Sequence, residues 1–296
     1  MKSFNNTFLN KFTFYLSHNP IDLFREVVYL ILFLVKREKR DMLSDDKSNI
    51  DHCLIVEGGS FKTGYTSGLL DAFIVSKFDP FTSCLGISGG AVALSYFLAD
   101  QYRGSLNSLL HLAKDENFLN YRRTFGKEGY MDIDMLKVVA QEKVPFDINK
   151  AFSDMNDKDV RFVLTHRESG DAYYMHPNKE NWLDLVTASC TLPFVTKGRH
   201  VIDGEEYFDG GWSDAIPAQR AYERGANRIT ILRTWPKDVL STQSWADYFG
   251  SIYFKSTPGL QKTFEQSYEK YNKSIEFINN PPNDLIIDQL CPFKLL

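Results

Sequence analysis

Residues 85–97 read LGISGGAVALSYF, and the fold can be inferred outward from this stretch. An apolar segment at 81–85 resembles a strand, residues 86–90 form a glycine-rich turn around Ser88, and residues from Ala91 onward resemble a helix start. A Gly-x-Ser-x-Gly motif between a strand and a helix is the context in which a serine nucleophile is held on a sharp turn. Because helix caps use the same residue types, the motif alone leaves Ser88 as either a nucleophile or a cap.

A second strand-loop-helix pattern precedes the first. Residues 53–56 form an apolar run that ends at Glu57, and apolar residues fall at helical spacing between Tyr65 and Val75. Two such units in succession favour an α/β fold, because neighbouring parallel strands need a crossover connection. Further strands are predicted at 161–165, 171–175, 201–202, 206–208, 228–232 and 285–287.

Composition narrows the class of function. The net charge of −4 argues against a nucleic-acid partner, because binding phosphates needs a basic face. The cysteines are widely spaced, so neither a zinc site nor a disulfide framework is indicated, and a cytoplasmic location is expected. No Asp, His and Glu cluster has metal-ligand spacing, so no metal or other cofactor is predicted. The four cysteines are Cys53, Cys84, Cys190 and Cys291.

The first 50 residues differ from the rest. Residues 1–50 are predicted to be an N-terminal helical segment and linker, followed by a catalytic domain over 51–296. The apolar run 27–35 is too short to span a membrane, which takes about 20 residues, and basic residues follow it. It is interpreted as a buried helix, as an interfacial anchor giving residues 20–40 peripheral membrane contact, or as a protein contact. The oligomeric state stays open.

A nucleophilic serine needs a base, and two candidates are present. No histidine follows His200, so His200 is the late histidine that a Ser-acid-His order would use. Asp209, followed by Gly210 and Gly211, lies at the end of a predicted hairpin strand and offers a carboxylate instead. The sequence therefore leaves a triad and a dyad open at Ser88.

Three motifs together resemble a known family. They follow one another in the order and spacing of the patatin-like phospholipases, and the similarity is closest to the bacterial branch whose first motif begins with Glu-Gly-Gly. The similarity extends from about residue 53 to the C-terminus. It implies a three-layer α/β/α patatin-like fold with a mostly parallel central sheet. The motifs are EGGSFK at 57–62, GISGG at 86–90, and DGG at 209–211 with SDAIP at 213–217.

The resemblance implies a serine acyl hydrolase that cleaves phospholipids or other lipid esters. Ser88 would attack the ester carbonyl, Asp209 would serve as its base, and an acyl-enzyme would form. The amides of Gly58, Gly59 and Ser60 would stabilise the oxyanion. Alternatives are a thioesterase or small-ester esterase with the same dyad, and a catalytically impaired lipid-binding module. Supporting positions are Lys62, Gly86, Gly89, Gly90, Gly210 and Gly211.

The first motif departs from the family pattern. Ser60 replaces the usual third glycine, Lys62 replaces the usual arginine and is expected to brace the loop, and Thr63 replaces another glycine. We expect Thr63 to disturb the loop more than Ser60, because a β-branched residue resists a positive φ.

Several neighbours of the motifs also carry expectations. Glu57 is expected to be a helix-dipole or salt-bridge partner near the glycine loop. Asp214 is expected to cap a helix that begins near Pro217, with a second acid as the alternative. Trp212 is expected either to line an acyl pocket or only to pack. Residues 187–194 are expected to shape the pocket wall.

Overall fold

A mixed β-sheet runs through the centre of the molecule. Within the described residues its strand order is β5-β6-β3-β2-β1-β7-β8, and β4 pairs with β3. The computed structural model describes residues 51–294, apart from 121–122, 124–128, 156, 194 and 197–199. The strands are β1 (His52–Val56), β2 (Ser83–Ile87), β3 (Asp159–His166), β4 (Ala172–Met175), β5 (His200–Ile202), β6 (Glu205–Asp209), β7 (Arg228–Leu232) and β8 (Ile286–Leu290).

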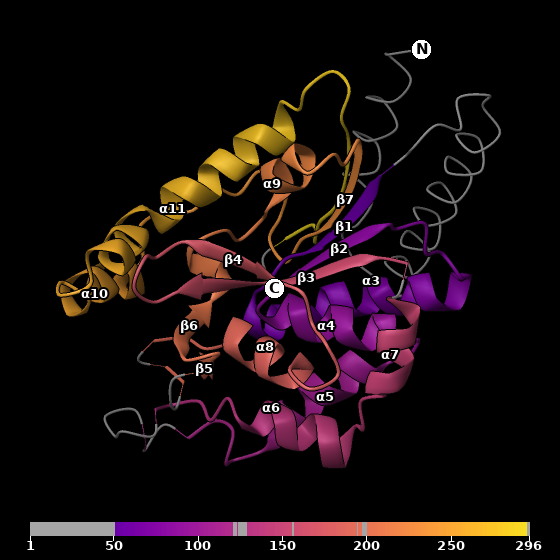
Figure 1. Ribbon diagram of the computed structural model, residues 1–296, viewed down its shortest axis with the longest axis horizontal. Coiled ribbons are helices and arrows are strands. Elements are labelled where there is room, and N and C mark those ends of the chain that lie inside the picture. Colours follow the sequence, from indigo (N-terminus) through magenta and orange to yellow (C-terminus); the bar gives the residue numbers. More distant parts are fainter. Residues whose placement is uncertain are drawn as a thin grey trace.

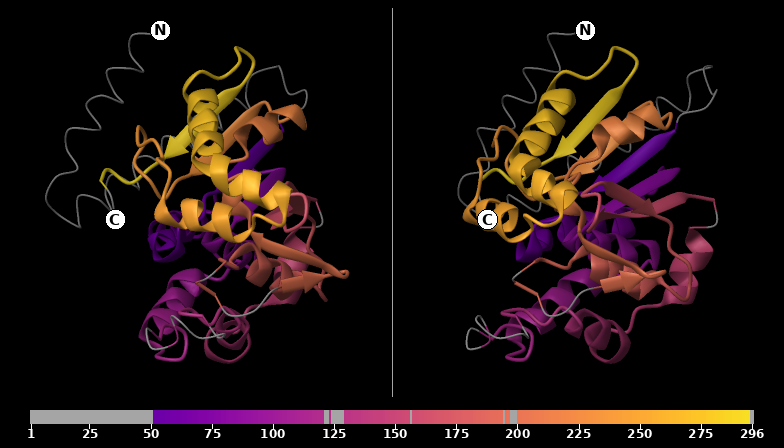
Figure 2. Two further views of the ribbon diagram at one scale, coloured as in Figure 1. Left: turned by 90° about the vertical axis from the view of Figure 1, so that its left-hand side faces the viewer. Right: turned by 60° about the vertical axis from the view of Figure 1, so that its left-hand side comes forward.

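Helices cover both faces of the sheet (Figures 1 and 2). Along β1, Leu54 and Val56 join the larger core cluster, whereas Cys53 and Ile55 join a second cluster on the opposite face. The larger cluster contains residues of α3 (Thr63–Ser76), α4 (Gly89–Leu98), α5 (Gly104–Lys114), α6 (Met135–Val138), α7 (Ile148–Asp154) and α8 (Trp182–Ser189). The second cluster contains residues of α9 (Ala218–Glu223) and α11 (Pro258–Asn279).

The pairing of β3 decides where the predicted motifs meet. On one edge of β3, Val163 pairs with Ile87 of β2, and the next residue, Leu164, pairs with Asp209 of β6. The same two residues pair with β4 on the other edge, so β2 and β6 share one edge of β3, end to end. Ser88, which follows Ile87, is thereby placed beside Asp209.

The predicted three-layer α/β/α fold with a mostly parallel sheet is confirmed. The four pairs among β1, β2, β3, β7 and β8 are parallel, and the two predicted hairpins are the antiparallel pairs β3–β4 and β5–β6. The predictions for residues 1–50, including membrane contact through 20–40, fall outside the described residues. None of the described helices is both long and apolar enough to cross a membrane.

Candidate active site

Ser88 lies on a one-residue turn between β2 and α4. Its φ of 54° and ψ of −131° are unusual for a residue with a side chain, and the serine is half-buried. The sequence-based turn at 86–90 was therefore too long, and the strand predicted at 81–85 begins two residues later. Gly86 belongs to β2, whereas Gly89 and Gly90 belong to α4.

Close packing explains why glycines flank this serine. A Cβ at Gly86 would lie 2.8 Å from the Ala91 Cα, and one at Gly90 would lie 2.1 Å from the Val56 carbonyl oxygen. Because glycine has no side chain, α4 can pack closely against β1 and β2. Ser88 is therefore the N-cap of α4 and lies at the positive end of the helix dipole.

Asp209 is buried at the end of β6, with 5% of its surface exposed. Its Oδ1 accepts a hydrogen bond of 2.8 Å from the Gly211 amide, and its own amide donates to the Thr191 carbonyl at 2.8 Å. Burial raises the pKa of Asp209 from its usual 3.8 to about 6, while hydrogen bonds from the Ser88 side chain and the Gly211 amide lower it. The carboxylate is thus close to the serine hydroxyl and more basic than a surface aspartate.

Ser189 is a positioning residue that the sequence did not reveal. Its buried Oγ accepts a hydrogen bond of 2.9 Å from the Ser88 amide and donates one of 2.7 Å to the Val163 carbonyl. The sequence offered the stretch 187–194 as a pocket wall and Ser189 as a rival nucleophile. Of this stretch, Leu192 is the described residue that lines the cleft. The Ser88 amide is therefore already paired with Ser189.

The glycine loop after β1 approaches the serine directly. A Cβ at Gly58 would lie 2.7 Å from the Ser88 Cβ and 3.4 Å from its Oγ, so only glycine fits without a shift. Gly59 lies against Thr234, whose hydroxyl donates to the Gly58 carbonyl. Within the described residues, the amides of Gly58, Gly59 and Ser60 donate to no protein acceptor.

The departure from the family pattern affects this loop at Ser60, not at Thr63. Ser60 is exposed and has a φ of 53°, a left-handed conformation in which glycine is favoured. Thr63 has an ordinary helical φ of −63°, and its hydroxyl donates to the Ser60 carbonyl. The expectation that Thr63 would be the more disruptive substitution was therefore wrong, because the positive φ falls three residues earlier.

Glu57 lies at the start of the glycine loop and forms the predicted salt bridge, with Arg233 as its partner. Its Oε2 lies 3.6 Å from the Arg233 Nε and accepts from the Thr234 amide at 2.6 Å. Its Oε1 accepts from the Tyr271 hydroxyl at 3.2 Å. Burial raises the pKa of Glu57, and the positive charge of Arg233 lowers it in part. The network joins β1 to β7 and α11, so it holds the start of the glycine loop in place.

A cleft of about 480 Å³ contains both the serine and the aspartate. The glycine loop, Leu192, residues 239–241 and side chains from α11 line it. Trp212 lines the cleft and also packs on Phe264 with ring centroids 4.6 Å apart, so it does more than pack. The Lys62 Nζ lies 3.7 Å from the centre of the Trp235 ring, a cation–π contact within the cleft wall.

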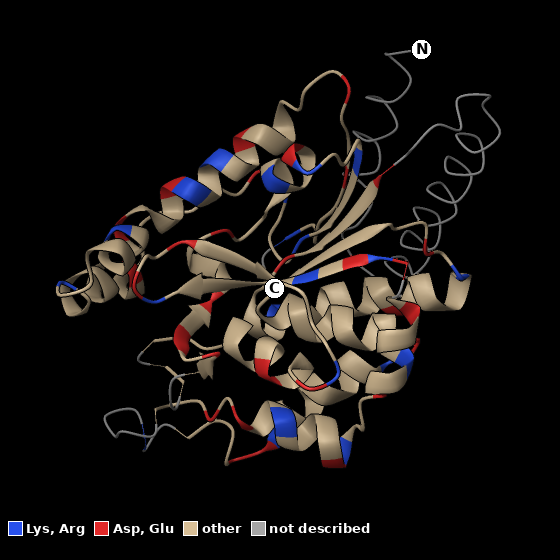
Figure 3. Ribbon diagram, in the orientation of Figure 1, with Lys and Arg blue, Asp and Glu red and all other residues tan. Residues whose placement is uncertain are grey.

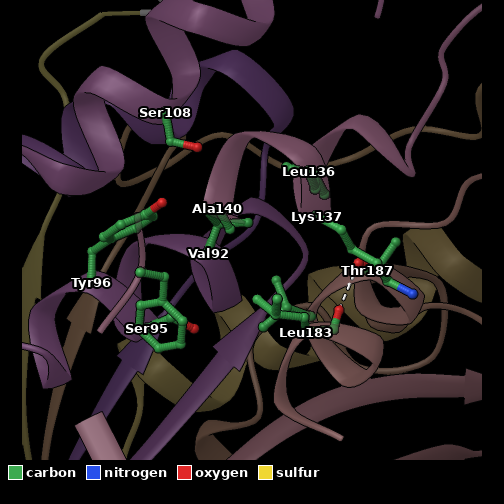
Figure 4. A pocket seen from close by; sticks show the side chains of 11 residues that line it. Val92, Ser95, Tyr96, Ser108, Leu136, Lys137, Ala140, Leu183 and Thr187 are labelled. Atoms are coloured by element: carbon green, nitrogen blue, oxygen red, sulfur yellow. Dashed lines mark hydrogen bonds between the residues drawn. The ribbon is translucent and has the colours of Figure 1, made fainter. Parts of the chain in front are cut away.

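A smaller cavity lies within the helical layer (Figure 4). Its volume is about 20 Å³, and side chains of α4, α5, α6 and α8 enclose it. Such a space holds about one water molecule. Because it has no room for a substrate and Ser88 does not line it, the candidate active site is the larger cleft.

Two other sequence candidates do not line the cleft that contains Ser88 and Asp209. His200 begins β5, with its Nε2 3.7 Å from Asp134, and no histidine is among the described residues that line the cleft. Asp214 does not cap α9, whose N-cap is Pro217, but accepts a hydrogen bond of 2.5 Å from the Tyr174 hydroxyl. Across the described residues, no group of three or more His, Cys, Asp or Glu side chains is placed to hold a metal ion.

Comparison with known proteins agrees with this architecture. A family model described as patatin-like phospholipase matches residues 54–222, more than half of the chain. The chain therefore belongs to the patatin-like phospholipase family, which supports a lipid acyl hydrolase.

This chain is similar to the following curated relative and solved structure. The uncharacterized protein YjjU of Escherichia coli (strain K12) is 29% identical over 248 residues, which cover 82% of this chain and 69% of YjjU. The crystal structure of VipD from Legionella pneumophila is 12% identical with a TM-score of 0.38, over 81% of this chain and 72% of VipD.

Proposed function

We propose that this protein is a serine acyl hydrolase that cleaves carboxylic esters of phospholipids through a Ser88–Asp209 dyad. Asp209 accepts the proton of the Ser88 hydroxyl while the Ser88 Oγ bonds to the ester carbonyl carbon. The tetrahedral intermediate collapses by breaking the bond to the leaving oxygen, and Asp209 returns the proton to the departing alcohol. Water, deprotonated by Asp209, then attacks the acyl carbon. The bond from that carbon to the Ser88 oxygen breaks, Asp209 returns the proton to this oxygen, and the fatty acid leaves.

The glycine loop and α4 supply the electrostatic part of this mechanism. The amides of Gly58, Gly59 and Ser60 have no protein acceptor within the described residues, so they are free to donate to the oxyanion. One such donor typically contributes about 3–4 kcal/mol to the transition state. The N-terminus of α4, which begins at Ser88, favours the same negative charge.

One observation carries the proposal. Consecutive residues of β3 pair with the end of β2 and the end of β6, and Ser88 and Asp209 both line the same cleft. The strained turn at Ser88 costs about 1–3 kcal/mol, which a mere helix cap does not require. Burial of Asp209 also disfavours its charged form and raises its pKa, a perturbation that is common among catalytic bases.

The test is hydrolysis of p-nitrophenyl butyrate by the full chain and two variants, Ser88→Ala and Asp209→Asn. We expect each variant to lose at least about 10³-fold in kcat, because the nucleophile or its base is absent. Asp214→Asn is the matched control, because Asp214 is also a carboxylate whose burial raises its pKa to about 6, yet it does not line the cleft. Wild-type rates in Asp209→Asn would remove that residue from the mechanism.

A fluorophosphonate probe separates nucleophilic from structural effects at Ser88. We expect mass spectrometry to find the probe on the peptide that contains Ser88, and labelling to be lost in Ser88→Ala. Labelling of a different serine would contradict the proposal. With phosphatidylcholine as substrate, free fatty acid and lysophospholipid are the expected products. Preferential turnover of acyl thioesters would instead favour the thioesterase alternative.

The left-handed Ser60 motivates the alternative of a catalytically impaired lipid-binding module. Ser60→Gly relieves the strain of a φ of 53°, about 1–2 kcal/mol, without removing the amide. For an active enzyme we expect its kcat to stay within about threefold of wild type. An inactive wild type that becomes active in Ser60→Gly would instead support the impaired module.

A further inference from the structure

We propose that helix α10 is the element that docks this protein on a lipid surface. The helix runs from Trp245 to Tyr253 and lies at one corner of the molecule, beyond the start of α11 (Figure 1). This proposal rests on the proposed function in one respect: the lipid surface that α10 contacts is taken to contain the ester substrate. Its outward face, called here the α10 face, consists of Trp245, Tyr248, Phe249 and Ile252.

The polarity of α10 is inverted relative to an ordinary surface helix. The exposed fractions on the α10 face are 77% for Trp245, 48% for Tyr248, 57% for Phe249 and 53% for Ile252. These positions follow helical spacing and form one stripe. An ordinary surface helix directs such a stripe into the core.

Polar and small residues instead face the protein. Asp247 is buried, caps the helix with Ser244 in a capping box, and accepts a hydrogen bond of 2.8 Å from the Ser267 hydroxyl. At Gly250 a Cβ would lie 2.5 Å from the Phe264 ring, so α10 packs closely on α11. These contacts fix which face of the helix points outward.

The rings of the α10 face form one continuous apolar surface. The Trp245 ring centroid lies 6.4 Å from that of Tyr248 and 6.2 Å from that of Phe249. The only charged residue of α10 is the buried Asp247, whereas acidic and basic residues recur along α11 (Figure 3). Scattered single apolar residues are normal on a protein surface, but a contiguous patch marks an interaction site.

The position of α10 beside the cleft favours lipid as the occupant. Ser244 and Asp247 line the cleft that contains Ser88, so α10 forms part of its rim. Tryptophan and tyrosine are the side chains enriched at membrane–water interfaces, where an apolar ring carries a polar tip. Docking through the outward face would bring the cleft mouth to the lipid, and an ester could reach Ser88 without crossing bulk water.

The size of the patch argues against a second copy of the chain. Aromatic side chains offer about 150–250 Å² each, so the α10 face and the neighbouring Tyr253, which is 63% exposed, provide roughly 600 Å². A stable protein interface needs about 800 Å² from each partner. An interfacial helix needs only its own apolar stripe to enter the headgroup region.

Tryptophan fluorescence gives a test that is independent of catalysis. Of the four tryptophans, Trp182 is fully buried, Trp212 and Trp235 are half-buried, and only Trp245 is exposed. On adding vesicles of equal parts phosphatidylcholine and phosphatidylglycerol to the full chain, we expect a blue shift of the emission. Phosphatidylcholine brominated in its acyl chains should quench this emission, and Trp245→Phe should lose both effects.

Flotation with the same vesicles compares two triple variants. The α10 variant carries Trp245→Ser, Phe249→Ser and Ile252→Ser, and we expect it to float at least roughly tenfold less than wild type. The matched control carries Val75→Ser, Tyr102→Ser and Leu110→Ser, three exposed apolar residues outside α10, and should float like wild type. Hydrolysis of vesicular phosphatidylcholine should fall with flotation, whereas p-nitrophenyl butyrate hydrolysis should stay within twofold.

The outcomes distinguish docking from the proposed function. Equal flotation of the α10 variant and wild type, or an emission that vesicles do not change, would overturn docking through α10. A dimer that the α10 variant converts to a monomer in size-exclusion chromatography with light scattering would overturn it in favour of a second copy. Bromolipid quenching without any Ser88-dependent ester hydrolysis would sink the proposed function and leave α10 docking in place.

Discussion

The raised pKa of Asp209 predicts how hydrolysis depends on pH. Asp209 must be deprotonated to accept the Ser88 proton, and burial raises its pKa to about 6. We therefore expect kcat/KM for a soluble ester to rise with pH through a midpoint near 6. An aspartate with an ordinary pKa of 3.8 would already be fully active at pH 5.

The size of the effect follows from that pKa. At one pH unit below the midpoint about a tenth of the molecules hold Asp209 deprotonated, and at one unit above about nine tenths do. The expected rate at pH 5 is therefore about a tenth of the rate at pH 7. Below pH 5 the rate should fall about tenfold for each further unit.

The assay is hydrolysis of p-nitrophenyl butyrate between pH 4 and pH 8, with product measured by chromatography so that the signal does not vary with pH. Asp214 is the internal control, because burial also raises its pKa to about 6. We expect the midpoint to stay near 6 in Asp214→Asn. A profile that is flat between pH 5 and pH 7, or a midpoint that moves with Asp214→Asn, would refute the assignment of the base to Asp209.

Three further predictions concern the surroundings of the dyad. The folded state holds the Asp209 proton more tightly than the unfolded chain does, so the free energy of unfolding falls as pH rises from about 4 to about 6. At pH 8, Asp209→Asn should therefore be more stable than wild type by up to about 3 kcal/mol in urea unfolding. Equal stability of the two proteins would contradict this. Ser189→Ala leaves the Ser88 amide without its acceptor and should lower kcat more than it changes KM. The free energy of unfolding should fall by about 1–3 kcal/mol. An unchanged kcat would refute the positioning role of Ser189. Gly58→Ala should reduce kcat about 10²-fold, because the added methyl group crowds Ser88. The control is Gly68→Ala on α3, where the added methyl group meets open space, so this variant should keep its activity and be slightly more stable. Equal activity of the two variants would contradict the close approach of Gly58 to Ser88.

Local sequence patterns determined the elements and the chemistry of the motifs. Apolar runs and turn residues predicted both hairpins and the layered α/β architecture, because strand and helix periodicity depend on neighbours in the chain. Ser88 was identified because small residues must flank a sharp strand-to-helix turn. The wrong prediction for Thr63 arose because sequence spacing does not show which loop residue takes a positive φ. That depends on how the glycine loop packs against α4 and β7.

Contacts between distant segments were decided only by the tertiary structure. Nothing local to residues 187–194 shows that the Ser189 hydroxyl joins the Ser88 turn to β3, or that β2 and β6 end side by side on one edge of that strand. The inward Asp247 and the outward aromatic stripe of α10 depend likewise on α11, against which the helix packs at Gly250. The sequence indicated the candidate side chains, and long-range pairing and packing determined which of them meet, because such contacts depend on the whole folded chain.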